Sequence, residues 1–397
     1  MSPIERAARQ KANVMTRQQV IMKAIEGRIT WIQAADILRI TGRQLRRLRE
    51  RFESLGSQGL LDGRAGHERG KRIPPAVLAE ICRLKREVYA DFSVKHFHEQ
   101  LAAKHQVELS YTWTKEVLQA AGLVEKSAAR GKHRRKRERR PMIGMLLHLD
   151  ASTHEWIAGV PKQDLNVLLD DADGRILFAR FVAQEGTAST LEALLFVLQR
   201  LGRFSEFYTD RGSHFCRTGD TTKGPDDEQN GQVARVLRAL GIRHILARSP
   251  EARGRSERAF GTIQGRLPQE LRVAHIESYA AANVYLEKTF IPDFNRRFTV
   301  TPAQAESAFT PIAGIDLDML ISAQHDRVVR NDNTVTFERV TLQLPARKDR
   351  LHFVRCPVLV HEFVDHTLGI SFQGQLLARF TRDGELLKAV GKRLEAA

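Results

Sequence analysis

Apolar runs of strand length alternate with amphipathic stretches of helical length between residues 142 and 298. Three apolar runs come first, and Asp170-Asp-Ala-Asp-Gly174 between the second and the third is a turn sequence that favours a hairpin. We expect strands at 142–150, 165–169, 175–182, 206–209 and 242–247, and helices at 187–201, 229–240, 257–271 and 278–298. This order predicts an α/β domain built on one sheet over residues 142–310.

Acidic residues lie at the ends of two of these strands and at the start of one helix. Asp150 closes the first strand, Asp210 follows the strand at 206–209, and Glu257 opens the helix at 257–271. Such positions can bring three carboxylates to one edge of a sheet. Carboxylate oxygens suit Mg²⁺, and a pair of such ions is a common device for breaking phosphodiester bonds. We therefore predict catalysis by these three residues as ligands of two Mg²⁺ ions, with Mn²⁺ as a substitute.

Each acid also has a purely structural interpretation. Asp150 and Asp210 could simply cap strands, and Glu257 could stabilise the first turn of its helix through the helix dipole. Asp170, Asp171 and Asp173 are rival acids that fit a turn better, and Glu251 is a rival third ligand in the loop before the helix. The occurrence of all three acids in this order favours catalysis.

The charge balance indicates a polyanionic partner. The chain has 397 residues, with 63 Lys and Arg against 47 Asp and Glu, a formal net charge of +16. Double-stranded DNA is the leading candidate. The longest apolar run, 142–149, is too short to span a membrane, and the N-terminus has no apolar signal core. Three distant cysteines form neither a disulfide framework nor a zinc spacing. We expect a cytoplasmic, nucleoid-associated protein.

The pattern over residues 1–61 predicts a helix-turn-helix domain. An apolar helix, the short turn at 40–42 with Thr41 as a cap, and a basic second helix follow one another. The outward residues of the second helix are predicted DNA contacts: Arg43, Gln44, Arg46, Arg47 and Arg49. The alternative is a basic surface helix in a small bundle.

A basic linker at 62–73 precedes a second helical domain at 74–125. Its last helix is capped at Ser110 and stopped at Gly122, which permits a second helix-turn-helix or a purely structural bundle. The exposed contacts expected there are Tyr111, Thr112, Thr114 and Lys115.

The segment 126–141 is a strongly basic linker, which could act as a tether, a phosphate-binding segment or both. Its predicted DNA contacts include Arg134, Arg135, Lys136 and Arg137, and Arg253 and Arg255 are predicted contacts beside Glu257. Short strands at regular spacing over 328–390 predict a small β-barrel that binds DNA or serves as a packing module.

The central segment resembles the integrase core of bacterial insertion-sequence transposases, the DDE group related to retroviral integrases. Three hairpin-linked strands followed by alternating helices and strands match the order of an RNase H-like domain. Three segments carry the resemblance: Thr209-Asp-Arg-Gly-Ser-His-Phe215, the run 249–264 around Glu257, and Thr301-Pro-Ala303. The resemblance implies that Asp150, Asp210 and Glu257 bind the metal ions, and that the helix-turn-helix units bind the terminal inverted repeats of a mobile element.

Two departures from the family pattern stand out. The separation between Asp210 and Glu257 is longer than in the common version of the group, and an inserted loop at 212–232 accounts for the excess. The zinc module of retroviral integrases is absent from the sequence.

The full prediction is a multidomain protein with N-terminal all-α helix-turn-helix domains, a central α/β RNase H-like integrase core and a C-terminal small β-barrel. It would cleave DNA strands and transfer them to a target. Joining two element ends requires a homo-oligomer, at least a dimer on DNA. The alternatives are a DNA-binding regulator with an inactive core, and a nuclease or resolvase without strand transfer.

Overall fold

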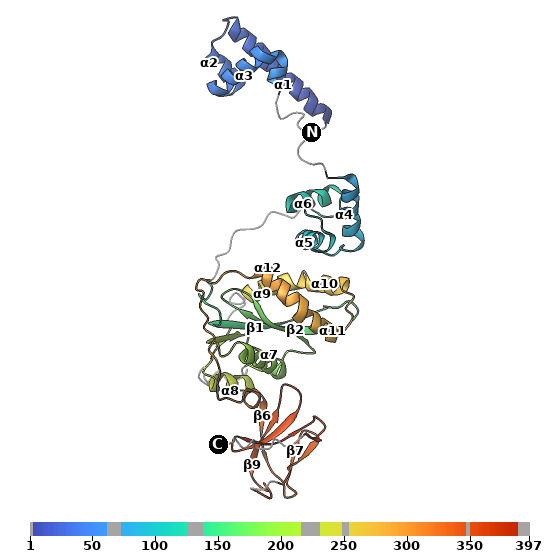
Figure 1. Ribbon diagram of the computed structural model, residues 1–397, viewed down its shortest axis with the longest axis vertical. Helices are drawn as coiled ribbons and strands as arrows, with labels where there is room; N and C mark the ends of the chain where they lie inside the picture. The colour runs from blue at the N-terminus through green and yellow to red at the C-terminus, as the bar shows by residue number, and fades with distance from the viewer. Residues whose placement is uncertain are drawn as a thin grey trace, which may run out of the picture. The chain divides into compact units, whose positions relative to one another are not determined.

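The structure is a computed structural model that describes residues 3–61, 73–125, 138–215, 231–247, 254–346 and 350–387, with side chains from residue 12 onward (Figure 1). The chain divides by contacts into two units, Met1–Ala79 and Glu80–Ala397. Most of the linker at 62–73, the basic run 126–137, most of the loop at 212–232, Glu251 and Arg253 lie outside the described residues. Among the helices that are described, none is long and apolar enough to cross a membrane.

The first unit contains the predicted helix-turn-helix arrangement. Its helices are α1 (Pro3–Ile25), α2 (Trp31–Leu38) and α3 (Gly42–Leu55), followed by the 3₁₀ turn η1 (Gly56–Leu60). Thr41 caps α3 as predicted, because its hydroxyl accepts from the Gln44 N–H. In turn, the Thr41 N–H donates to the Gln44 side-chain oxygen. Ile21, Ala34, Leu45 and Leu60 form the small core. Burial of Leu45 turns the basic face of α3 outward.

A second group of helices follows: α4 (Pro75–Glu87), α5 (Val94–His105) and α6 (Tyr111–Ala120). Ser110 caps α6 as predicted, through a bond from the Trp113 N–H. Thr114, which we expected at the surface, is fully buried, and its hydroxyl donates to the Ser110 carbonyl. The expectation was wrong because Thr114 lies four residues after Ser110, on the face that carries the buried Leu118.

The core is a five-stranded mixed sheet. Its strands are β1 (Leu146–His154), β2 (Gln163–Asp170), β3 (Ile176–Val182), β4 (Glu206–Thr209) and β5 (Arg243–Leu246). The spatial order is β3-β2-β1-β4-β5; β1, β2 and β3 are antiparallel neighbours, whereas β1, β4 and β5 run parallel. The predicted order of elements is therefore confirmed, although β1 continues four residues beyond Asp150.

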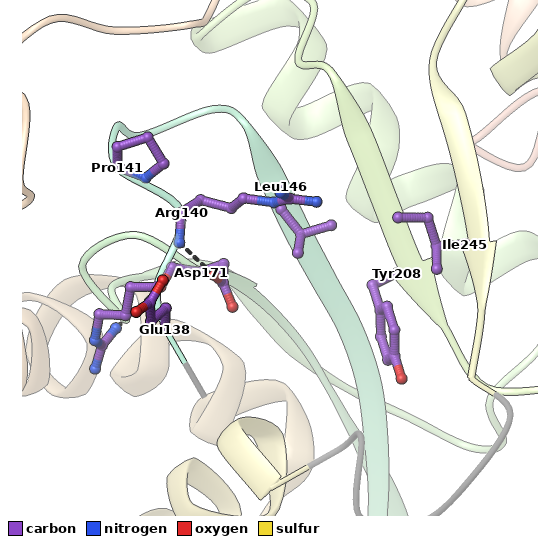
Figure 2. A pocket seen from close by; sticks show the side chains of 8 residues that line it. Glu138, Arg140, Pro141, Leu146, Asp171, Tyr208 and Ile245 are labelled. Carbon is purple, nitrogen blue, oxygen red and sulfur yellow. Dashed lines mark hydrogen bonds between the residues drawn. The ribbon is translucent and has the colours of Figure 1, made fainter. Parts of the chain in front are cut away.

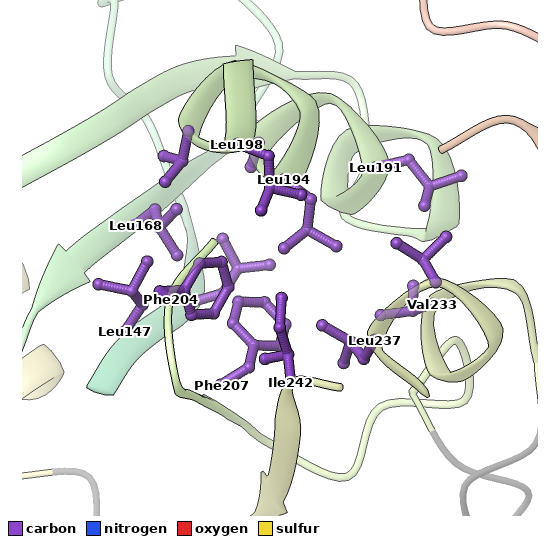
Figure 3. Packing of buried hydrophobic residues seen from close by; sticks show 14 of the residues in the cluster. Leu147, Leu168, Leu191, Leu194, Leu198, Phe204, Phe207, Val233, Leu237 and Ile242 are labelled. Atoms are coloured by element: carbon purple, nitrogen blue, oxygen red, sulfur yellow. The ribbon is translucent and has the colours of Figure 1, made fainter. Parts of the chain in front are cut away.

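Helices cover both faces of this sheet (Figure 1). On one face, α7 (Thr187–Arg200) and α8 (Gln232–Ala239) pack against Leu147 and Phe207, as Figure 3 shows. The other face carries α9 (Gly254–Gln264), α10 (Leu267–Val273), α11 (Tyr279–Tyr285) and α12 (Ile291–Phe298). Their apolar residues join Trp156, Leu165 and Val167 in a second core. Alternation along each strand gives the sheet these two apolar faces.

The long closing helix predicted at 278–298 is continuous but not uniform. A π-helical turn, η3 (Leu286–Phe290), separates α11 from α12. Pro292 lies two residues after this turn, in the first turn of α12, and because proline has no N–H and its ring crowds the preceding turn, a regular α-helix cannot run through it from α11. The wider π turn leaves room for the proline ring and lets the chain continue into α12.

The C-terminal strands form an open sheet. After α13 (Leu317–Leu320) come β6 (Ala323–Val328), β7 (Thr334–Phe337), β8 (Val340–Gln343), β9 (Pro357–Glu362), β10 (Leu368–Phe372), β11 (Gln375–Phe380) and β12 (Leu386–Leu387). One sheet has the order β12-β11-β10-β9-β6, and β7 pairs with β8 in a second, two-stranded sheet. In the described part of the chain, β6 and β12 do not pair to close this sheet, so the predicted barrel is not confirmed.

Candidate active site

The pairing of β1 with β4 directs two of the three predicted carboxylates toward the same edge of the sheet. Leu146, Leu147 and His148 lie opposite Glu206, Phe207 and Tyr208 in parallel register. The pairing ends at His148 and Tyr208, and the same register extended by two residues directs Asp210 toward Asp150. Both residues are partly exposed, and both lie on the face of the sheet that α9 covers. The end of β4 thus places Asp210 beside the middle of β1.

Hydrogen bonds orient the segment that carries Asp210. The Gly212 N–H donates to Oδ1 of Asp210 at 2.8 Å. The Thr209 hydroxyl bonds Nε2 of the buried His244 at 2.8 Å and also reaches the Asp210 carbonyl at 3.0 Å. These bonds tie the turn after β4 to β5, and they restrict the positions open to the Asp210 carboxylate.

His214 also belongs to this site, although sequence reasoning used it only as part of a motif. Its ring lies 3.9 Å from that of Phe215, and its Nε2 is 3.7 Å from Oε1 of Glu185, in the loop before α7. The four-residue separation from Asp210 was a usable signal for His214. No sequence signal pointed to Glu185.

Gly212 leaves no room for a side chain. A Cβ built there would lie 2.9 Å from Cε1 of His214 and 3.1 Å from Oδ1 of Asp210. We predict that Gly212→Ala displaces both side chains and lowers the DNA strand cleavage expected from the sequence about 10²-fold, the effect typical of misplaced catalytic groups. The melting temperature should change little, because the segment is partly exposed. Gly254→Ala is the control, since a Cβ at Gly254 meets nothing within 4 Å. Equal cleavage by Gly212→Ala and the unaltered protein would show that the turn tolerates a side chain.

Glu257 lies in the first turn of α9, on an exposed part of the helix. Gln264, seven residues later and thus on nearly the same helix face, donates from its amide to the Ser152 hydroxyl at 2.8 Å. Ser152 is two residues beyond Asp150 on β1, so this face of α9 is directed toward the strand that carries Asp150. Within the described residues, however, no three His, Cys, Asp or Glu side chains lie close enough together to hold a metal ion.

The rival acids Asp170, Asp171 and Asp173 lie toward the start of β1, where they form hydrogen bonds within the protein. Asp170, Asp171 and Asp173 form the predicted turn between β2 and β3, but all three are buried rather than exposed. Burial raises the pKa of Asp170 to about 6, although the N–H groups of Gly144 and Ala172 both donate to its carboxylate. Burial also opposes the charge of Asp171, but bonds from His148 and the Arg140 N–H outweigh burial and hold its pKa below the usual value.

A pocket of about 440 Å³ adjoins this turn (Figure 2). Figure 2 shows the Arg140 backbone beside Asp171 and its side chain extending to Leu146, with Tyr208 and Ile245 on the neighbouring strands. Arg140 also forms an ion pair with Glu206, so its charge is largely compensated. The polar groups around this turn therefore form a structural network that reaches β1 through His148.

Arg255 takes part in that network. Its guanidinium donates to the Asp171 carbonyl at 2.6 Å and lies 3.2 Å from the Asp171 carboxylate, with 19% of the side chain exposed. This contact fastens the start of α9 to the turn between β2 and β3. The DNA contact predicted for Arg255 remains a prediction.

Comparison with known proteins decides the family. A putative transposase of Sinorhizobium fredii, y4bF, is 31% identical to the chain over 367 residues, which cover 91% of this chain and 79% of that protein. This chain belongs to the bacterial insertion-sequence transposases. The transposase for insertion sequence IS1202 of Streptococcus pneumoniae is 25% identical over 378 residues, 86% of this transposase and 80% of that protein.

Further comparisons concern parts of the transposase. Residues 17–79 match the family model described as a winged helix-turn helix. The magnesium-bound catalytic core of HTLV-2 integrase has 18% identity and a TM-score of 0.28, covering 38% of this chain and 91% of that chain. The simian T-cell lymphotropic virus intasome has 14% identity and a TM-score of 0.33, covering 79% of this chain and 100% of that chain. With TM-scores this low, the family assignment rests on the two sequence relatives.

The predicted DNA contacts of this transposase lie mostly on helix surfaces. Arg43, Gln44, Arg46, Arg47 and Arg49 are exposed on α3. Two of them have internal partners: the Gln44 side chain accepts from the Thr41 N–H, and Arg49 pairs with Glu53 at 2.6 Å. On α6, Tyr111 and Thr112 are exposed and Lys115 is half-buried. Arg134, Arg135, Lys136, Arg137 and Arg253 lie outside the described residues, and these roles remain predictions.

Two buried histidines make the stability of the transposase depend on pH. Burial lowers the pKa of both His244 and His361 from 6.5 to about 4. Between about pH 4 and pH 6.5, the two histidines bind protons in the unfolded chain but not in the folded chain. Stability is therefore present above pH 6.5 and lost as the pH falls toward 4, by up to about 3 kcal/mol for each histidine. Urea unfolding between pH 7.5 and pH 5 measures the loss. His361→Gln should flatten this dependence, and an unchanged dependence would contradict the assignment.

Proposed function

We propose that this transposase binds the ends of its element and catalyses metal-dependent DNA strand cleavage and strand transfer. The observation that carries the proposal is the parallel register of β1 and β4, which, extended by two residues, directs Asp210 toward Asp150 on the face covered by α9. Two adjacent carboxylates on rigid strands, with a third acid on a helix directed toward the same strand, form a donor set suited to hard divalent cations.

The proposed metal ligands are Asp150, Asp210 and Glu257. The first two fit by chemistry and position, and Glu257 supplies the third oxygen donor from α9. When bound, two Mg²⁺ or Mn²⁺ ions would supply Lewis acidity to the reacting phosphate and stabilise the attacking and leaving oxygens. The chain contributes the orientation: the Gly212 N–H holds one oxygen of Asp210, and the bond between Gln264 and Ser152 holds α9 against β1.

The proposed reaction has two steps at one site. In the first, water attacks a backbone phosphorus, the P–O3′ bond breaks, and the released O3′ takes a proton and becomes a free 3′-hydroxyl. In the second, that hydroxyl loses its proton and attacks a phosphorus of target DNA, where another P–O3′ bond breaks. Neither step requires a covalent bond to the protein, so no Ser or Tyr nucleophile is assigned.

DNA recognition is proposed for the winged helix-turn helix region and for α6. The exposed arginines of α3 suit a DNA groove and its phosphates. The chain as a whole has a net charge of +16, which favours binding to a polyanion. Two element ends must meet for joining, so we propose at least a dimer on DNA.

One observation favours a second candidate, a DNA-binding regulator with an inactive core. In the part of the chain that the structure describes, the three predicted ligands do not gather into a metal site. The two candidates differ in their products, since a regulator binds the ends without cutting them.

The test is to incubate the protein with the DNA that flanks its gene and a supercoiled target plasmid. Parallel reactions contain Mg²⁺, Mn²⁺ or EDTA, and sequencing maps every nick and joint. Joining of the ends to the plasmid in Mg²⁺ and Mn²⁺, but not in EDTA, supports the proposal. Nicks without joints would favour a nuclease or resolvase, and binding without cleavage would favour the regulator.

A further inference from the structure

Helix α5 contacts the catalytic core through one carboxylate and two guanidinium groups. Oε2 of Glu99 accepts bonds from Arg266 at 2.7 Å and from Arg297 at 2.6 Å. All three side chains are largely buried, with 17%, 10% and 19% of their surfaces exposed. Burial opposes the charge of Glu99, but the two arginines outweigh burial and hold its pKa below the usual value. Removing any one of these charged groups would leave another charge buried without a partner, which is strongly destabilising.

Two further contacts join the same surfaces. His96, which is fully buried on α5, lies 3.0 Å from Oε1 of Glu270 on α10. Arg272 on α10 pairs with Asp91 at 2.5 Å and donates to the Val88 carbonyl at 2.8 Å. Residues of segment 88–99 therefore contact residues more than 160 positions away in the sequence at three separate points.

The contacts also connect a predicted DNA contact to the helix of Glu257. The Lys95 ammonium lies 5.6 Å from the centre of the Tyr111 ring and 3.6 Å from Glu99. Arg266, the next partner of Glu99, directly follows Gly265 at the end of α9, where Gln264 bonds to Ser152 on β1. A continuous path of contacts thus runs from Tyr111 through Lys95, Glu99 and Arg266 to the helix that begins beside Glu257.

We propose that Glu99 is a positioning residue, which holds helices α5 and α6 on the core so that DNA bound at Tyr111 is presented to the carboxylates beside α9. This inference rests on the proposed strand-cleaving function. Glu99 touches neither DNA nor the reacting phosphate in this scheme. Glu99 acts through its ion pairs with Arg266 and Arg297. These ion pairs hold α5 against the core, and α6 is held in place together with α5.

The first experiment measures docking without any reaction. Asp91→Cys and Arg272→Cys are introduced together into the full chain, with Cys82, Cys216 and Cys356 replaced by serine, and the protein is treated with a short bis-maleimide. Both positions are about half exposed, so both thiols are accessible. We expect efficient crosslinking, which falls at least fivefold when Glu99→Arg is added. Mobility on a denaturing gel separates a link within one chain from a link between two chains.

A charge exchange tests whether the partner is the one proposed. Glu99→Arg with Arg266→Glu again places one negative group between positive groups at 99 and 297, so crosslinking should return to at least half of its original level. Glu108→Arg is the matched control, because it makes the same charge change at an exposed position in the loop after α5. Unchanged crosslinking in Glu99→Arg, or no recovery in the exchange, would overturn the proposal. Should Glu99→Arg misfold by circular dichroism, Glu99→Gln replaces it.

The second experiment separates positioning from binding. Using the duplex that flanks the gene, Glu99→Arg should change DNA affinity no more than Glu108→Arg does. Its cleavage rate at saturating DNA should fall about 10²-fold, as expected for a misplaced substrate, and recover in the exchange variant. A loss of affinity alone would overturn the positioning role. If the unaltered protein cleaves no DNA, the proposed function fails, whereas crosslinking still decides whether Glu99 docks the helices.

Discussion

Asp210→Asn should lower DNA strand cleavage by about 10³-fold or more while leaving DNA binding intact. The substitution preserves the shape of the side chain but removes the charge that the proposed metal site requires. Losing one neutral oxyanion donor alone costs about 10²- to 10³-fold in enzymes, and losing a charged ligand should cost at least as much. Asp150→Asn should behave in the same way, because the register of β1 and β4, extended by two residues, directs the two carboxylates toward each other. Cleavage rates and binding isotherms with the duplex that flanks the gene measure the two properties separately.

Asp383→Asn is the matched control, since this exposed residue lies in the C-terminal sheet region, away from the proposed site. Glu257→Gln tests the third ligand on its own. If Glu257→Gln keeps full activity, Glu257 is not a ligand, and Glu251 becomes the next residue to replace. Cleavage by Asp210→Asn at the rate of the unaltered protein would remove the basis of the proposed function.

The double substitution Arg46→Ala and Arg47→Ala should weaken binding to the element ends about 10- to 100-fold. Both guanidinium groups are exposed on α3, on the outward face of the winged helix-turn helix region. Each lost phosphate contact should also lower the dependence of log affinity on log salt concentration by about 0.9. Fluorescence anisotropy at several salt concentrations gives both the affinity and this slope.

Arg28→Ala is the control for that experiment, because Arg28 is 71% exposed but lies in the loop before α2. It should change affinity much less than the α3 substitutions do. Equal effects of Arg28→Ala and the α3 double variant would indicate nonspecific electrostatic binding rather than recognition by α3. An unchanged salt slope in the double variant would show that neither arginine contacts a phosphate.

Local signals predicted the elements well. Capping by Thr41 and Ser110 depends on bonds to residues three positions away, and both caps form as predicted. The order of core strands and helices follows from the spacing of apolar residues, which reflects which side of each element is buried. The turn at 170–174 was also predicted, because its acidic residues and glycine favour a tight connection.

Properties that depend on distant partners were not predicted. Burial of Asp171 requires His148, Arg140 and Arg255, which no local pattern associates with a turn. The open C-terminal sheet depends on whether its edge strands pair, and similar alternating strands serve open and closed sheets. The contacts of Glu99 with Arg266 and Arg297 join residues more than 160 positions apart.

The sequence by itself therefore determined the kind and order of the elements, the basic face of α3, and the candidate residues Asp150, Asp210 and Glu257. Periodicity and capping are local properties of a chain, so they can be recognised without knowing what each element meets. The tertiary structure alone decided the register in which β1 and β4 pair, that Asp170, Asp171 and Asp173 are buried, and that α5 docks on α10 and α12. Strand register and ion-pair partners depend on how the elements pack, which no single segment specifies.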